Sequence, residues 1–370
     1  MILKNAQYID VAEQIKRDKC SVVIYGAGMI GKIVVPYIVK QYDLYNYVEC
    51  YVDMDQSKIG TQVQMEEHAY EIQHPDMLRQ KKDKRIIFIT NSKFYPVIEY
   101  LDGMEALEET QAYLIPVMQI QQAHQAIPVT LPTEAEEGSI PKVIHYCWFG
   151  KKEMPDFLKK CIASWKRICP DYEIIEWNES NYDVSKFSYS KEAYENGKYG
   201  FVTDIARLDI LYTYGGIYLD TDVMLLKSPE PLLFQKAFVG VEKWGNINSG
   251  GMMGAEPGHP MLKELLDYRK QFHFVNDDGS LNLETNGVYE TIPFINRGMK
   301  INNTLQVIND VTVYPSSVFH PYDYMSGEDR MEEWTFSKHY FYGGWMEKTD
   351  MNNRTDTQCK YSQIVERMKK

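Results

Sequence analysis

The stretch that decides the predicted fold is residues 201–223, FVTDIARLDILYTYGGIYLDTDV. Apolar side chains three or four positions apart over residues 198–214 predict a helix with one buried face. Two glycines then end the helix in a tight turn, and the apolar IYL that follows predicts a short strand. Asp220 and Asp222 come directly after this strand. Both need a positive partner, because an isolated buried carboxylate is strongly disfavoured.

Asp220 and Asp222 together predict a metal site. Alternation along an extended strand would point both carboxylates to one side and Thr221 to the other. They would stand at the carboxyl edge of a sheet, where α/β proteins bind ligands. Two hard oxygen donors suit Mg²⁺ or Mn²⁺, which usually bind one or two carboxylates together with substrate phosphates. A second Asp-x-Asp, at residues 53–55, shows that only this context distinguishes the motif.

The helix before the aspartates carries a second pair of charged residues. Asp204 and Arg207 are three positions apart and therefore share one helix face. On an exposed surface such an ion pair would stabilise the fold by well under ~1 kcal/mol. This helix is otherwise apolar and must pack close to the aspartate strand. We therefore favour a role for the pair in the same site.

Four stretches resemble a known family. Residues 140–150 (IPKVIHYCWFG), 201–223, 247–251 (INSGG) and 338–345 (KHYFYGGW) are similar to glycosyltransferase family 32, the sugar-region glycosyltransferases that bear a DXD motif. The resemblance implies a GT-A fold, a UDP- or GDP-sugar donor, Mn²⁺ or Mg²⁺ as cofactor, and retention of anomeric configuration. It also implies a saccharide or lipid-linked saccharide acceptor, as in the synthesis of a surface polysaccharide.

The resemblance implies a role for each matching residue. Trp148 would stack on the donor base, as an indole face can, and Asn248 would face the transferred sugar. The full set comprises four catalytic residues, Asp204, Arg207, Asp220 and Asp222; five donor-binding residues, Trp148, Thr203, Tyr218, Asn248 and Trp345; and three metal ligands, Asp220, Asp222 and His339. Many relatives carry two adjacent histidines where this chain has one histidine followed by a tyrosine. His339 is therefore either the third metal ligand or a structural histidine in a core strand.

The amino-terminal part of the chain carries a different motif. Apolar strands at residues 20–28, 48–53 and 85–90, with a helix expected over residues 29–42, predict a parallel Rossmann-like sheet. The loop after the first strand carries Gly26, Gly28 and Gly31, and Asp53 ends the next strand, which is the context of a dinucleotide-binding fingerprint. This part resembles the nucleotide-sugar-binding domains attached to some sugar acyltransferases. The alternative is that the glycines only allow close packing of helix and strand.

The predicted organisation is two α/β domains. A Rossmann-like domain covers residues 1–125, a linker without periodicity covers 126–139, a GT-A glycosyltransferase domain covers 140–350, and a tail helix covers 351–370. A chain of 370 residues has the length for two domains.

Composition excludes several classes of protein. The formal net charge of −12 disfavours nucleic-acid binding, which needs an excess of lysine and arginine. Six cysteines without a C-x-x-C pair argue against a zinc ribbon or a disulfide scaffold. We find neither a signal-peptide core nor an apolar run near the ~20 residues of a membrane helix. We therefore expect a cytoplasmic protein, with contact at the inner face of the membrane left open by the basic carboxyl end.

Two other classes of function stay open at this point. One is an NAD-dependent epimerase or oxidoreductase of nucleotide sugars that uses the amino-terminal domain. The other is a non-catalytic sugar-binding protein with a decayed site. The first predicts bound NAD, and the second predicts no transfer to any acceptor.

Overall fold

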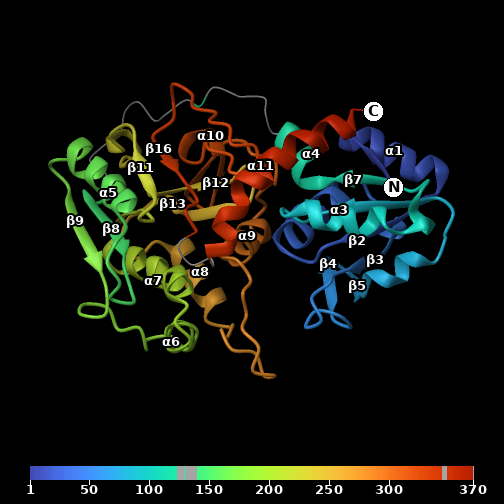
Figure 1. The fold of residues 1–370 in the computed structure, drawn as a ribbon. Helices are drawn as coiled ribbons and strands as arrows, with labels where there is room; N and C mark the ends of the chain where they lie inside the picture. Colours follow the sequence, from blue (N-terminus) through green and yellow to red (C-terminus); the bar gives the residue numbers. More distant parts are fainter. Residues whose placement is uncertain (123–128, 130–139, 344–347, 370) are drawn as a thin grey trace. The chain divides into compact units, whose positions relative to one another are not determined.

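The computed structural model describes residues 1–122, 129, 140–343 and 348–369. The chain forms two compact units, one of Met1–Gln125 with Asn352–Lys370 and one of Ala126–Met351. Nearly all of the predicted linker, and also Trp345, lie outside the described residues. Each unit is built around one seven-stranded sheet (Figure 1).

The first unit has a doubly wound sheet in the order β1-β7-β6-β2-β3-β5-β4. The strands are β1 (Ile2–Lys4), β2 (Ser21–Tyr25), β3 (Val48–Val52), β4 (Gln62–Met65), β5 (His68–Gln73), β6 (Arg85–Ile89) and β7 (Gln111–Leu114). All neighbouring pairs are parallel except β4 with β5. The continuous apolar runs of β2 and β6 are buried, as expected for strands covered on both faces. The predicted α/β class is confirmed.

Three helices connect strands of this first sheet: α1 (Tyr8–Asp18), α2 (Val35–Gln41) and α3 (Phe94–Asp102). Helix α4 (Ile115–Gln122) follows its last strand along the chain, and α11 (Lys348–Met368) is the last helix. The helix expected over residues 29–42 is present, but its first part, Ile30–Val34, is a π-helical turn. Pro36 lies at the start of α2 and has no N–H to donate to a carbonyl of the preceding turn. The regular α-helix therefore begins only at α2.

The glycine loop after β2 is packed tightly by its own neighbours. Gly26 has φ +107° and donates its N–H to the Val52 carbonyl at 2.8 Å. A Cβ on Gly31 would lie 2.1 Å from the Gly26 carbonyl oxygen, whereas a Cβ on Gly28 would meet nothing within 4 Å. Two of the three glycines therefore permit close approach of the chain to itself, and only Gly28 borders open space.

The contrast between these glycines predicts a difference in stability. We expect Gly31→Ala to lower the free energy of unfolding by about 1–3 kcal/mol, because the methyl group would overlap a backbone oxygen. We expect Gly28→Ala, the matched control, to change it by less than ~0.5 kcal/mol. Calorimetric unfolding of the full chain measures both. Equal stability of the two variants would contradict the packing role of Gly31.

The second unit has a mixed sheet in the order β14-β15-β12-β13-β10-β8-β9. Its strands are β8 (Val143–Cys147), β9 (Glu173–Trp177), β10 (Gly216–Tyr218), β12 (Ala237–Val241), β13 (Ile247–Ala255), β14 (Gln306–Ile308) and β15 (Val311–Tyr314). Strand β10 lies inside the sheet and pairs in parallel with β8 and antiparallel with β13. A separate ribbon joins β11 (Val223–Leu225) to β16 (Ser337–His339) (Figure 1).

The helices of the second unit are α5 (Asp156–Ile168), α6 (Ser188–Glu195), α7 (Tyr199–Tyr214), α8 (Pro260–Arg269), α9 (Asn286–Asn296) and the short α10 (Ser316–Phe319). The helices from α6 to α9 pack in sequence against one another, whereas α5 packs on β11 and α10 on β12 and β16. Helix α7 contacts α6, α8 and β8, and α9 packs on α8 and β13. The predicted helix before the aspartates is thus confirmed, and it is buried along much of its length.

A turn of two glycines connects α7 to β10 of the sheet. Gly215 and Gly216 have φ +68° and +90°, and a Cβ on either would lie 2.7 Å from another atom. Glycine alone fits there without strain, so β10 can start immediately beside β8. After β10, the Asp220 N–H donates to the Gly250 carbonyl at 2.8 Å, which fixes the following turn against β13. In the part of the chain that is described, no helix combines the length and apolar character needed to cross a membrane.

Candidate active site

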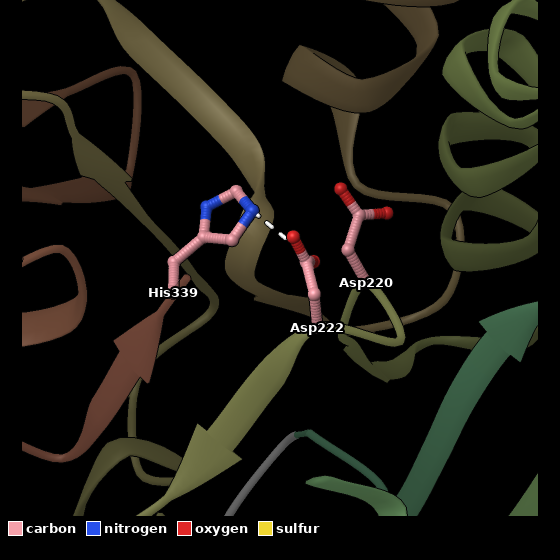
Figure 2. A group of neighbouring side chains, drawn as sticks. All are labelled: Asp220, Asp222 and His339. Atoms are coloured by element: carbon pink, nitrogen blue, oxygen red, sulfur yellow. Dashed lines mark ion pairs between the residues drawn. The ribbon is translucent and has the colours of Figure 1, made fainter. Parts of the chain in front are cut away.

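Three predicted metal ligands meet at the end of β10. Asp220, Asp222 and His339 each offer one ligand atom, and these atoms lie within 4.8 Å of one another. Figure 2 shows the three side chains converging, with the histidine contributed by another strand, β16. The register of the small ribbon explains the meeting, because Val223 of β11 pairs directly with His339. Two carboxylates and one imidazole form a donor set that fits a divalent cation such as Mn²⁺.

The two aspartates converge for a different reason from the one predicted. The alternation argument required an extended strand, but β10 ends at Tyr218. Asp220, Thr221 and Asp222 instead form a turn, closed by a hydrogen bond from the Val223 N–H to the Asp220 carbonyl at 3.0 Å. The convergence is therefore a property of the turn between β10 and β11.

Asp222 already has a positive partner in the structure. Its Oδ1 lies 3.3 Å from Nε2 of His339, and its Oδ2 accepts the Tyr342 N–H at 2.6 Å. Burial alone would raise the pKa of Asp222, but His339 and the Tyr342 amide hold that pKa below its usual value. In turn, burial would lower the pKa of His339, and the charge of Asp222 raises it above its usual value. The carboxylate and the imidazole thus stabilise each other as an ion pair.

Asp220 belongs to a second set of contacts, built around Arg207. The Arg207 side chain is only 4% exposed, and its Nη2 lies 3.0 Å from Asp204 Oδ1 and 3.4 Å from Asp220 Oδ1. Its guanidinium also covers the Tyr218 ring at 5.2 Å, and the Tyr218 hydroxyl donates to Asp220 at 3.0 Å. Burial raises the pKa of Asp204, although Arg207 and Arg269 oppose this. The helix pair and the Asp-x-Asp turn are therefore one electrostatic network.

Two buried charged residues of this network were not predicted. Glu290 of α9 accepts hydrogen bonds from the Ser249 N–H at 3.0 Å and the Ser249 hydroxyl at 2.5 Å. Arg269, at the end of α8, has its guanidinium between two tyrosine rings and lies 3.9 Å from Asp204 Oδ2. Glu290 is the one charged residue of its helix, a signal that could have identified it. Arg269 resembles any basic residue in a last helical turn, so its local sequence carries no such signal.

The environment of Glu290 predicts a pH dependence. Burial raises its pKa from the usual 4.5 to about 7, although Arg207 and Ser249 oppose the rise. The folded protein therefore holds this proton more tightly than the unfolded chain, and the free energy of unfolding falls as pH rises from 4.5 towards 7. We expect Glu290→Gln, which cannot ionise, to gain up to ~3 kcal/mol relative to the natural chain across this window.

Denaturation of both proteins at a series of pH values between 5 and 8 measures this difference. A difference that stays constant with pH would show that Glu290 titrates as an ordinary carboxyl group. In that case Glu290 would lower the free energy of unfolding no more at high pH than at low pH.

The contacts of the predicted donor-binding residues are mainly local. The Trp148 indole N–H donates to the Lys152 carbonyl at 2.7 Å, and the Thr203 hydroxyl donates to the Tyr199 carbonyl at 3.2 Å. Asn248 accepts from two backbone amides of its own strand and donates to Glu242 at 2.6 Å. These contacts do not test donor binding, so the roles of all three side chains stay predictions. The predicted role of Trp345 falls outside the described residues.

Asp53, predicted to belong to a nucleotide-binding motif, makes its contacts with the glycine loop and a nearby lysine. Asp53 Oδ2 accepts the Ala27 N–H of the glycine loop at 2.8 Å, and Lys58 Nζ lies 3.5 Å away. The aspartate therefore anchors the loop, as Gly26 and Gly31 do by close packing. These contacts support the packing interpretation, and nucleotide binding in this unit stays a prediction.

Fold and site together define the class. An α/β protein with paired aspartates at the carboxyl edge of its sheet has the arrangement expected of a nucleotide-sugar transferase. Residues 155–239 match the family model described as "Glycosyltransferase sugar-binding region containing DXD motif". Residues 155–239 therefore correspond to the sugar-binding region of DXD-bearing glycosyltransferases, and the resemblance inferred for this part of the sequence is confirmed.

Similar proteins include fungal mannosyltransferases. The chain is 32% identical over 143 residues to inositol phosphoceramide mannosyltransferase 3 of Schizosaccharomyces pombe, which covers 38% of this chain and 40% of that protein. It is 31% identical over 137 residues to the mannosyl phosphorylinositol ceramide synthase SUR1 of Saccharomyces cerevisiae. This match covers 36% of this chain and 35% of that protein. The chain thus matches less than half the length of these relatives. A solved structure, the PaToxG glycosyltransferase, aligns with 20% identity and a TM-score of 0.35, covering 49% of this chain and 75% of that one.

Proposed function

We propose that this protein is a metal-dependent, retaining glycosyltransferase that moves a hexose from a nucleotide-diphosphate sugar to a saccharide acceptor. The observation that carries the proposal is the meeting of Asp220, Asp222 and His339 beside the Arg207–Asp204 pair. The names of the two fungal relatives, both of which refer to mannosyl transfer, favour mannose as the hexose. A lipid-linked acceptor, and a location in the cytoplasm or at the inner face of its membrane, are part of the same proposal.

The charges of the site suit the departure of a diphosphate. A divalent cation, held by Asp222 and His339 with Asp220 beside them, would stabilise the negative charge that grows on the leaving phosphate. The Tyr342 N–H orients Asp222 for this role, because it holds the carboxylate oxygen that does not face the imidazole. Asp204 and Arg207 would hydrogen-bond the hydroxyls of the donor sugar. Their ion pair is almost wholly buried, which keeps both side chains in a fixed orientation.

Retention of configuration needs either a double displacement or attack from the face of the leaving group. We propose front-face attack, in which the acceptor hydroxyl approaches beside the departing diphosphate and gives its proton to a phosphate oxygen. In the described chain, Glu290 is fully enclosed and bonded to Ser249, so this buried carboxyl group is unsuited to act as a nucleophile. The low exposure of the Arg207 network also limits competing hydrolysis by water.

A thermal-shift screen of nucleotide sugars, each with and without Mn²⁺, tests this function. A donor at one hundred times its Kd stabilises the folded state by about 2.7 kcal/mol. We expect a shift for one UDP- or GDP-hexose only when Mn²⁺ is present, followed by transfer of that hexose to an acceptor with its anomeric configuration kept. Stabilisation by NAD with epimerised sugar as product would favour the oxidoreductase, and donor binding without any transfer would favour a sugar-binding protein.

A further inference from the structure

A second histidine stands directly behind His339. His320 follows the short helix α10, is 3% exposed, and belongs to none of the motifs recognised in the sequence. Its Nδ1 lies 3.3 Å from Nδ1 of His339, and the two ring centres are 5.4 Å apart. At this distance one nitrogen must donate a proton and the other must accept it. The two imidazoles are therefore joined by a single hydrogen bond whose direction decides the tautomer of each ring.

The contacts of His339 favour one direction for this bond. Its Nε2 points to Asp222 Oδ1 at 3.3 Å, so its Nδ1 is the nitrogen that faces His320. A histidine that binds a metal through Nε2 needs a lone pair there and carries its proton on Nδ1. Metal-ligating histidines almost always donate that other N–H to a fixed acceptor. His320 Nδ1 occupies the place of such an acceptor.

Two strands of the sheet fix the position of the His320 ring. A Cβ on Gly251 of β13 would lie 1.8 Å from the His320 Cε1 atom, and a Cβ on Gly240 of β12 would lie 3.1 Å from its Nε2. The two neighbouring strands therefore leave room for the imidazole only because both positions are glycine. The His320 backbone N–H also donates to the Ser316 carbonyl at 2.7 Å. With close packing on these sides, the ring cannot turn away from His339 without moving the strands.

We propose that His320 is a positioning residue, which accepts the Nδ1 proton of His339 and so holds the Nε2 lone pair of His339 towards the two aspartates. This inference rests on the proposed metal site and goes beyond it by assigning the group that orients one of its ligands. His320 itself does not touch the metal. Its loss should weaken metal binding while the three ligands remain present.

Two substitutions separate this role from simple packing. In His320→Asn, the amide oxygen can stand close to the place of Nδ1 and still accept the proton from His339. His320→Leu fills a similar volume but offers no acceptor. The matched control is His259→Asn, because His259 is equally buried in the same unit and its Nδ1 accepts the Met261 N–H at the start of α8.

The experiment titrates the purified full chain with Mn²⁺ alone and measures free Mn²⁺ by electron paramagnetic resonance. We expect His320→Leu to weaken Mn²⁺ binding about 10- to 100-fold, with His320→Asn and His259→Asn within about threefold of the natural chain. Nitrogen-15 spectra of the imidazoles, recorded with diamagnetic Mg²⁺ in place of Mn²⁺, report the tautomer of His339, and a proton on Nδ1 with none on Nε2 is expected in the metal-loaded natural chain. Thermal unfolding of each variant confirms that it is folded before titration.

The possible results separate the inference from the function on which it rests. Equal Mn²⁺ affinity of His320→Leu and the natural chain would overturn the role of His320 and leave the metal site standing. A His339 proton on Nε2 in the Mg²⁺-loaded natural chain would also overturn that role. A natural chain that binds no Mn²⁺, or that binds it equally well after Asp222→Asn, would overturn the metal site itself and the inference with it.

Discussion

Replacing Asp222 with asparagine is expected to abolish Mn²⁺ binding and to lower sugar transfer by a factor of about 10³ or more. The amide has the shape of the carboxylate and can still accept the Tyr342 N–H, so the turn should keep its geometry. It lacks the negative charge that a divalent cation requires, and it no longer holds His339 as an ion pair. The measurement combines Mn²⁺ titration with a transfer assay that uses the donor identified by thermal shift.

The chain offers a matched control in its other Asp-x-Asp motif. Asp55 lies in the first unit, and it bonds to Ser57 and lies near Lys58. We expect Asp55→Asn to leave Mn²⁺ binding and sugar transfer unchanged. This result would show that the structural context of an Asp-x-Asp motif, and not its residue types alone, creates the metal site. Transfer that survives in Asp222→Asn, measured with the correct donor, would defeat the assignment of Asp222. Circular dichroism of both variants should match the natural chain.

Replacing Asp204 with asparagine is expected to lower turnover about 100-fold while Mn²⁺ affinity stays within about threefold. Asp204 is absent from the group of ligand atoms formed by the Asp-x-Asp turn and His339. Its carboxylate instead lies 3.0 Å from Arg207 and 3.9 Å from Arg269, and its removal leaves these cations with less opposing charge. The donor sugar would then lose a charged hydrogen-bond acceptor and a correctly oriented arginine.

Another aspartate of α7 separates this effect from a general loss of stability. Asp209 is buried on the same helix, but its partners are Lys186 and Tyr182. We expect Asp209→Asn to lower the free energy of unfolding and to leave turnover per folded molecule unchanged. Equal loss of turnover in both variants would mean that Asp204 acts only through stability. Loss of Mn²⁺ binding in Asp204→Asn would show that its role is misassigned.

Local sequence determined the elements that support the site. The apolar spacing of α7, the glycines at its end and the apolar run of β10 depend on neighbours within a few positions, and all three are where they were predicted. The three-residue spacing of Asp204 and Arg207 likewise determined that they form an ion pair. In the first unit, the strands β2, β3 and β6 follow from apolar runs of the same kind.

Local patterns did not determine every contact near the two Asp-x-Asp motifs. The alternation of side chains along a strand predicted that Asp220 and Asp222 converge, and they do. The strand ends before them, however, and a turn brings the two carboxylates together. The spacing of the glycine loop matches a nucleotide-binding fingerprint, and the Asp53 carboxylate also accepts the Ala27 N–H of the loop itself, so nucleotide binding there stays a prediction. In both cases a contact with another strand fixes the aspartate or its loop. Asp220 is held by Gly250 of β13, and Asp53 arrives from the next strand.

Only the tertiary structure decided which distant residues complete the site. The pairing of β11 with β16 carries His339 to Asp222, and the packing of α8, α9 and α10 carries Arg269, Glu290 and His320 to the same network. The physical reason is that periodicity and turn chemistry act over a few residues. The meeting of side chains tens of positions apart depends instead on strand register and on shared burial, which also shifts their pKa values.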